Sequence, residues 1–215
     1  MKARRVKGLD AGAPLADNVE RIVLVRLDEL CSFVPRALDP SEVQALHDMR
    51  IAAKRLRYIL ETTADSCFGP YARAAARRAR ELQDLLGEVH DCDVTLPRVL
   101  GLLDDLRAAD AAVVRAAAGD AEDLDPALSA AAPHAGAWRG LTTLAVHLRA
   151  RRTLLFERFL ELWRELEREG FRPRLEYAAG ERPDAPARAA LAQLDEAADA
   201  VARAAAQSSP PPEAA

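Results

Sequence analysis

Residues 46–60 read LHDMRIAAKRLRYIL, and this stretch decides the class of fold. At about 100° per residue, its apolar side chains fall on one side of a helix; they are Leu46, Met49, Ala53, Leu56 and Leu60. A cationic stripe lies beside them within an arc of about 80°, made by His47, Arg50, Lys54 and Arg57. The stretch predicts an amphipathic helix with a basic row that lacks the carboxylates typical of a solvated face.

Two later segments carry similar rows. In residues 71–89, an arc of about 60° holds Arg73, Arg77 and Arg80, and Asp84 continues the polar stripe. A weaker set further along the chain is His147, Arg151 and Arg158. If these helices pack side by side, their rows converge on one basic surface suited to the oxygens of a linear polyanion. Arg55 and Arg78 lie off the rows and are expected to be ordinary surface charges.

Composition narrows the class of protein. The chain has 215 residues, of which 50% are hydrophobic and 30% charged, so wholesale disorder is excluded. No apolar run approaches the roughly 20 residues of a membrane span, and we expect a soluble cytoplasmic protein that does not engage membranes. Three cysteines without a CxxC motif indicate neither a disulfide framework nor a zinc site.

Basic and acidic residues are grouped in separate segments of the chain, although the formal net charge is only −4. Residues 47–80 hold eight basic and three acidic side chains, whereas residues 84–125 hold three basic and eleven acidic ones. Residues 139–174 are basic again, with nine basic against five acidic side chains. Blocks of this kind can assemble into surfaces of a single sign.

Good helix formers dominate the chain, and no run with a period of two predicts a strand. We expect helices over residues 14–34, 40–67, 71–89, 93–118, 137–168 and 187–206, with a junction near residues 87–91. Pro35 is expected to end the first helix, residues 119–133 to form a loop, residues 180–186 a linker and residues 207–215 a disordered tail.

The fold class is therefore all-α: an elongated bundle of about six or seven helices. The chain is either one elongated domain, or a four-helix unit over residues 14–118 with a shorter helical unit, residues 135–206, packed on it.

The sequence gives little support for metal binding, catalysis or nucleic-acid binding. His47, His90, His147, Asp91 and Asp93 do not have metal-ligand spacing, so we expect no metal and no cofactor. No nucleophile–base pair, P-loop or metal–carboxylate cluster is present in the sequence, so we expect no enzymatic activity. Nucleic acid is not the expected partner, because Tyr58 and Tyr71 are nearly the only aromatic residues near the basic rows.

Two segments resemble the CHAD family (conserved histidine α-helical domain). His47 to Tyr58 fits the pattern H-x-x-R-x-x-x-K-R-x-R-Y, and Leu82 to Val94 is similar to the family's Q-x-x-L-G-x-x-x-D-x-x-V segment. The resemblance covers about residues 14–180, in which residues 147–163 are similar to a later basic helix of the family, and only one of the family's two halves is clear.

The resemblance implies an all-helical bundle that binds inorganic polyphosphate and gathers on polyphosphate granules. His47, Arg50, Lys54 and Arg57 would then face the polymer, and Arg73, Arg77 and Arg80 occupy places where the family has further basic residues. Two alternatives stay open: an enzyme that acts on phosphoanhydrides, and a helical adaptor for nucleic acid or protein.

Overall fold

The structure is a computed structural model that describes residues 2–182 and residue 197. The predicted C-terminal helix, apart from residue 197, and the predicted tail lie outside these residues. The α-helices are α1 (Leu15–Cys31), α2 (Val34–Ala37), α3 (Val43–Cys67), α4 (Pro70–Ala117), α5 (Ala135–Arg168) and α6 (Phe171–Gly180), and η1 (Pro126–Ala131) is a 3-10 helix. The all-α elongated bundle is confirmed, with five helices of ten residues or more in the described part of the chain.

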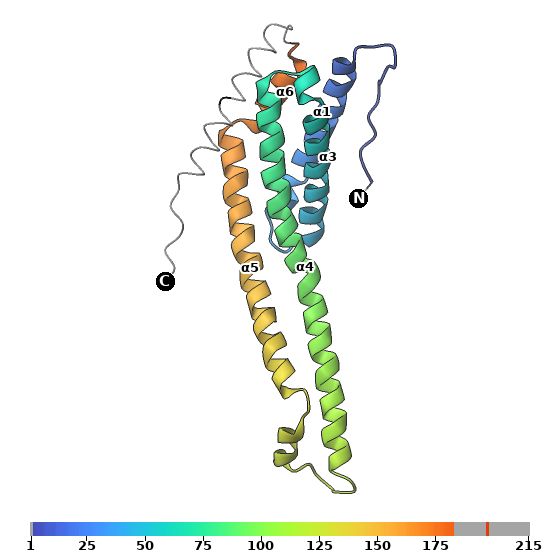
Figure 1. The fold of residues 1–215 in the computed structure, drawn as a ribbon, viewed down its shortest axis with the longest axis vertical. Coiled ribbons are helices and arrows are strands. Elements are labelled where there is room, and N and C mark those ends of the chain that lie inside the picture. The colour runs from blue at the N-terminus through green and yellow to red at the C-terminus, as the bar shows by residue number, and fades with distance from the viewer. Residues whose placement is uncertain (1, 183–196, 198–215) are drawn as a thin grey trace.

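The molecule consists of a bundle and an arm that extends from it (Figure 1). The bundle contains α1, α3, the first half of α4, the second half of α5 and α6. One continuous core joins these helices, and its fully buried side chains include Leu27, Met49, Leu56, Leu82, Phe159 and Leu175. Burial of each such side chain contributes about 1.5–3 kcal/mol. The four long helices of the bundle thus include α5, so the four-helix unit is not confined to residues 14–118.

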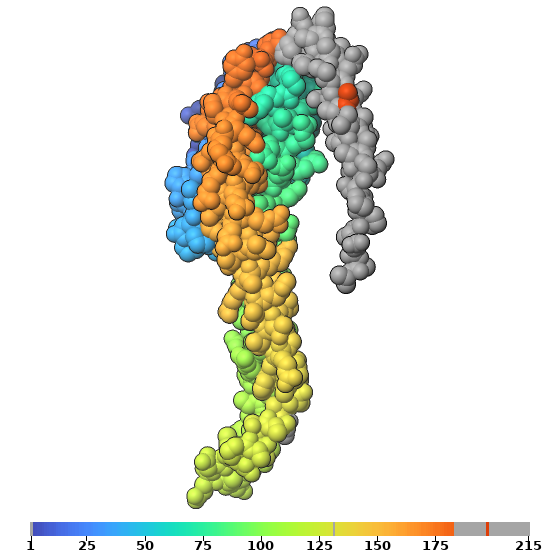
Figure 2. All heavy atoms as spheres, turned by 90° about the vertical axis from the view of Figure 1, so that its left-hand side faces the viewer, coloured from blue at the N-terminus to red at the C-terminus, as the bar shows by residue number. Residues whose placement is uncertain are grey.

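The arm is a pair of antiparallel helices, the second half of α4 and the first half of α5, closed by a loop and η1. Figure 2, viewed from the side of α5, shows how narrow the arm is below the bundle. Near its tip, Asp110 of α4 is only 1% exposed and accepts hydrogen bonds from the backbone nitrogen of His134 at 3.1 Å and from its Nδ1 at 2.6 Å. This contact fixes the start of α5 against α4.

The predicted junction near residues 87–91 is wrong, because these residues lie inside α4, a single continuous helix of 48 residues. The buried stripe of Leu82, Leu86, Val89 and Cys92 keeps its helical spacing across Gly87. A single glycine costs a helix only about 1 kcal/mol, which the burial of this stripe outweighs. Pro97 also lies inside α4 without ending it.

Helix ends differ from the predictions at three further places. α1 ends at Cys31, and Pro35 lies in the first turn of α2, where proline is tolerated. α3 begins at Val43, because Asp39 Oδ1 instead accepts hydrogen bonds from Ser41 in a tight turn. Gly170, with φ of 67°, turns the chain from α5 into α6, a helix that the sequence analysis did not predict.

None of the described helices is both long and apolar enough to cross a membrane.

Candidate polyanion-binding site

The two predicted basic helices, α3 and α4, lie antiparallel and in contact along the bundle. Three contacts set their register: His47 with His90, Glu61 with Arg80, and Asp65 with Arg73. The turn between them is short, since Pro70 starts α4 three residues after Cys67 ends α3. We call the surface along this contact the α3–α4 face; its basic residues are His47, Arg50, Lys54, Arg57, Arg73, Arg77 and Arg80.

At one end of the α3–α4 face, two histidine rings are in contact. Nδ1 of His47 lies 3.3 Å from Nδ1 of His90, and the ring centroids are 4.4 Å apart. Burial lowers the pKa of His47, and the charges of His90 and Arg50 lower it further. The free protein therefore favours a neutral His47, whereas a bound anion would favour the protonated ring.

The middle of the face holds two guanidinium groups with unused donors. Nε of Arg50 and Nε of Arg57 are buried and make no hydrogen bond. Arg50 also has no carboxylate partner among the described residues. A buried donor without an acceptor costs free energy.

Lys54 and Arg57 both make a cation–π contact with one aromatic ring. Lys54 Nζ lies 5.5 Å from the centroid of the Tyr58 ring, and the guanidinium carbon of Arg57 lies 4.6 Å from it. Tyr58 is 48% exposed, so its ring also meets solvent. Cation–π contacts of this kind hold both charges in place without neutralising them.

Two carboxylates partly neutralise the face, which corrects the expectation that matching acids are lacking. Glu61 Oε1 accepts from Arg80 Nε at 3.0 Å and Nη2 at 2.6 Å, and Glu61 Oε2 lies 3.6 Å from Arg57 Nε. Asp65 pairs with Arg73. Three of the six Arg and Lys side chains of the face therefore have a carboxylate partner.

The remaining three cations, Arg50, Lys54 and Arg77, have no carboxylate partner within residues 2–182. Lys54 and Arg77 are also exposed to solvent. The face thus keeps a net positive charge in a row that follows both helices, although the whole chain is acidic.

The third predicted set does not join this face, because α4 separates α5 from α3 (Figure 1). Arg151 Nη2 pairs with Glu88 Oε2 at 2.5 Å, on the α5 side of α4. Arg158 lines a cavity of 470 Å³ between α4 and α5 together with Asp84 and four glutamates. His147 is exposed on the arm part of α5. The expected convergence therefore holds for two helices and is wrong for the third, and Asp84 belongs to the acidic cavity.

Sequence reasoning missed several partners of these side chains. It left the role of His90 open, and it did not pair Glu61 with the basic row, although Glu61 follows Arg57 by four residues on the same helix. The expectation that Arg55 and Arg78 are ordinary surface charges is also wrong. Arg55 pairs with the buried Glu29, and Arg78 binds Glu81, Glu165 and Glu169.

Residues 2–100 match the family model of the CHAD domain. This part of the chain is a CHAD domain. The resemblance seen in the two motifs is confirmed, and the match includes the whole α3–α4 face. It ends within α4, so α5 lies outside the matched residues. No curated protein and no solved structure gives a significant match to the chain.

The chemistry available at the CHAD domain's α3–α4 face is that of anion recognition. Guanidinium groups give planar hydrogen bonds to phosphate oxygens, and lysine adds a mobile point charge. Within the part of the chain that the structure describes, no group of three or more His, Cys, Asp or Glu side chains is arranged to hold a metal ion.

Proposed function

We propose that the α3–α4 face binds inorganic polyphosphate without cleaving it. One observation carries the proposal: Arg50, Lys54 and Arg77 lie along two adjacent helices, and none has a carboxylate partner among the described residues. A CHAD domain over residues 2–100 is compatible with this role.

The arrangement favours a linear polymer over a single phosphate ion. Arg50 and Arg57 are seven residues apart, which corresponds to about 10 Å along α3, and Arg73, Arg77 and Arg80 extend a parallel row on α4. A row of this length offers several contacts to a repeating anion. Each contact displaces condensed counterions, so the affinity should fall steeply as salt concentration rises.

The test is isothermal titration with long-chain polyphosphate at several salt concentrations. We expect the wild-type chain to bind, and the triple variant Arg50→Ala/Lys54→Ala/Arg77→Ala to bind about tenfold more weakly, with a shallower salt dependence. The matched control is Arg98→Ala/Arg139→Ala/Arg149→Ala, which removes the same charge from exposed positions of the arm.

The outcomes separate the alternatives. Absence of binding by the wild-type chain, or equal affinity of the two triple variants, contradicts the proposal. Release of orthophosphate from polyphosphate in the presence of magnesium or manganese would instead indicate an enzyme. Displacement of polyphosphate by RNA at matched charge would favour a nucleic-acid adaptor.

A further inference from the structure

The N-terminal segment is attached along α1 by hydrogen bonds to its backbone. The backbone nitrogen of Arg4 donates to Glu29 Oε1 at 3.0 Å, and Arg26 Nη2 donates to the carbonyl oxygen of Arg4 at 2.7 Å. Arg21 donates to the carbonyl oxygen of Gly8. We call residues 2–8 the strap. Its backbone is held at two places, against side chains that are separated along α1.

A further pair of contacts continues this attachment to the start of α1. The backbone nitrogen of Asp10 donates to Asn18 Oδ1 at 2.9 Å, and Asn18 Nδ2 donates to the carbonyl oxygen of Asp10 at 2.7 Å. The chain therefore runs antiparallel to α1, with Arg4 beside the end of that helix and Asp10 beside its beginning (Figure 1). The family match starts at residue 2 and so includes the strap.

The attachment leaves three cations of the strap unneutralised. Arg4 pairs with Asp28. Lys2, Arg5 and Lys7 are exposed and have no carboxylate partner in the described part of the chain. Residues 2–8 contain no acidic side chain, so the strap carries a net positive charge that a polyanion can bind.

Glu29 connects the strap to α3. This carboxylate is 1% exposed, and its Oε1 accepts from the Arg4 backbone nitrogen and also from Arg55 Nη1 of α3 at 3.1 Å. Lys54, the residue before Arg55, belongs to the α3–α4 face. One helix, α3, thus has the strap beside one flank and the α3–α4 face on the other.

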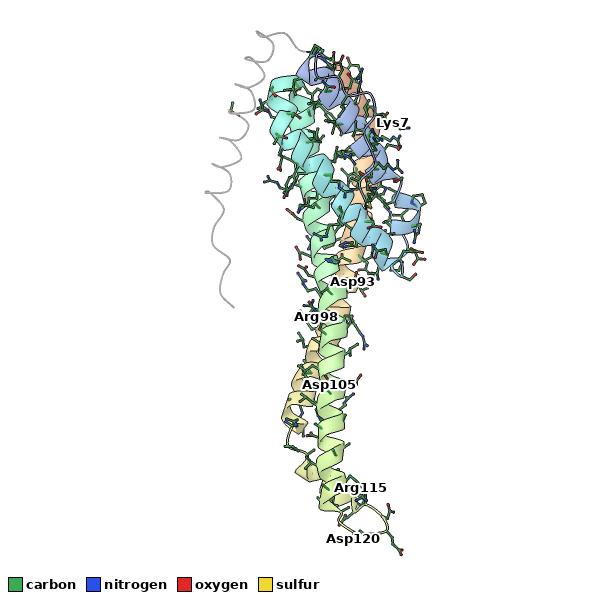
Figure 3. The ribbon with its side chains drawn as sticks, turned by 90° about the vertical axis from the view of Figure 1, so that its right-hand side faces the viewer. Lys7, Asp93, Arg98, Asp105, Arg115 and Asp120 are labelled. Carbon is green, nitrogen blue, oxygen red and sulfur yellow. The ribbon has the colours of Figure 1, made fainter. Side chains whose placement is uncertain are left out.

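Figure 3 is drawn from the side on which the strap runs, with Lys7 labelled beside α1. The strap, α3 and α4 are all seen from this side. Glu29 contacts both the strap and Arg55 of α3, so a polymer bound along α3 and α4 would cross α3 to reach the strap.

We propose that the strap is a second polyphosphate-binding row, through Lys2, Arg5 and Lys7, that a long chain engages together with the α3–α4 face. This inference rests on the proposed function of that face. Lys2 and Lys7 span about 17 Å if the strap is fully extended. A polymer that reaches both rows gains the second set of contacts at high effective concentration, whereas a short oligomer occupies one row only.

The test compares tripolyphosphate with long-chain polyphosphate by isothermal titration on the full chain. The variant is Lys2→Ala/Arg5→Ala/Lys7→Ala, and the control is the arm variant Arg98→Ala/Arg139→Ala/Arg149→Ala. We expect the strap variant to lose about fivefold or more in affinity for the long chain and to keep wild-type affinity for tripolyphosphate. Circular dichroism checks that each variant is folded.

Three results overturn the inference while leaving the proposed function intact: unchanged affinity of the strap variant for the long chain, equal losses for both ligands, or the same loss in the arm variant. The last two would indicate a general effect of net charge. Failure of the wild-type chain to bind either ligand would instead overturn the proposed function itself.

Discussion

Nδ1 of His47 lies 3.3 Å from Nδ1 of His90, so the two histidines join α3 to α4 at one end of the α3–α4 face. At this distance one nitrogen can donate to the other only if at least one ring is not protonated at that atom. Two imidazolium rings would repel each other, and Arg50 adds a further positive charge nearby. The contact therefore couples the protonation of His47 to whatever anion occupies the face.

Binding of polyphosphate should strengthen as the pH falls from about 7.5 to about 5.5. The free protein disfavours a proton on His47, because burial and then the charges of His90 and Arg50 lower its pKa. A bound polyanion favours that proton, so binding is linked to proton uptake. Titrations across this range should show a smaller gain for His47→Asn than for wild type. The control is His147→Asn on the arm, and equal gains in both variants would contradict the prediction.

The imidazole of His47 also affects the free energy of unfolding in the absence of ligand. Since the pKa of His47 in the folded protein lies below the value of 6.5 for a free histidine, the unfolded chain takes up the proton first as the pH falls. This histidine should therefore reduce the free energy of unfolding below about pH 6.5, and His47→Asn should remove that part of the pH dependence. Urea unfolding of both proteins between pH 5 and pH 8 measures the difference; parallel curves would rule it out.

Removing the carboxylate of Glu61 should increase the affinity for polyphosphate. Glu61 neutralises Arg57 and Arg80, so Glu61→Gln leaves two further cations available to the ligand. For a partly exposed charge we expect about a two- to fivefold gain in affinity, with a change in unfolding free energy of no more than about 1 kcal/mol.

The control for this change is Glu88→Gln, which releases Arg151 on the opposite side of α4. It alters the net charge by the same amount without altering the α3–α4 face. If both variants gain equally, the effect comes from net charge alone and the assignment of the face fails.

The features that the sequence could predict are those with a local cause. The apolar and basic stripes of α3 follow from side-chain spacing within one helix, and Gly69 and Pro70 mark the turn into α4. Because that turn is short, α3 and α4 must lie antiparallel and in contact. Side-chain spacing and the short turn are therefore enough to assign Arg57 and Arg80 to one surface.

The features that could not be predicted depend on packing between distant segments. The row of Arg151 and Arg158 has the same spacing as the others, yet α5 packs on the opposite side of α4, where Glu88 pairs with Arg151. The strap is attached through Glu29, a carboxylate that nothing in the local sequence marks as buried. Spacing fixes the angle of a side chain around its own helix, whereas the neighbour it meets depends on the whole core.

Glu29 should be essential to the stability of the bundle. Its carboxylate is 1% exposed and pairs with Arg26 and Arg55, whose side chains are 11% and 27% exposed. Glu29→Gln leaves two partly buried cations without their counter-charge, for which we expect a loss of about 3 kcal/mol in the free energy of unfolding.

Asp28→Asn serves as the comparison, because the neighbouring Asp28 is 55% exposed and pairs with Arg4 and Arg172 at the surface. Its replacement should cost less than about 1 kcal/mol. Urea unfolding at constant pH measures the loss of unfolding free energy in both variants. Similar losses would contradict the prediction that the buried ion pairs of Glu29 stabilise the bundle more than the exposed ion pairs of Asp28.

Gly87→Ala should stabilise the protein by about 0.5–1 kcal/mol. Gly87 lies inside the continuous helix α4, and a Cβ atom added there would meet nothing within 4 Å. Gly170→Ala should have the opposite effect, with a loss of about 1 kcal/mol, because Gly170 has φ of 67° at the turn between α5 and α6. Thermal and urea unfolding of the two variants distinguish these cases. A destabilised Gly87→Ala variant would mean that α4 bends or breaks at this residue, as expected of a junction between two separate helices.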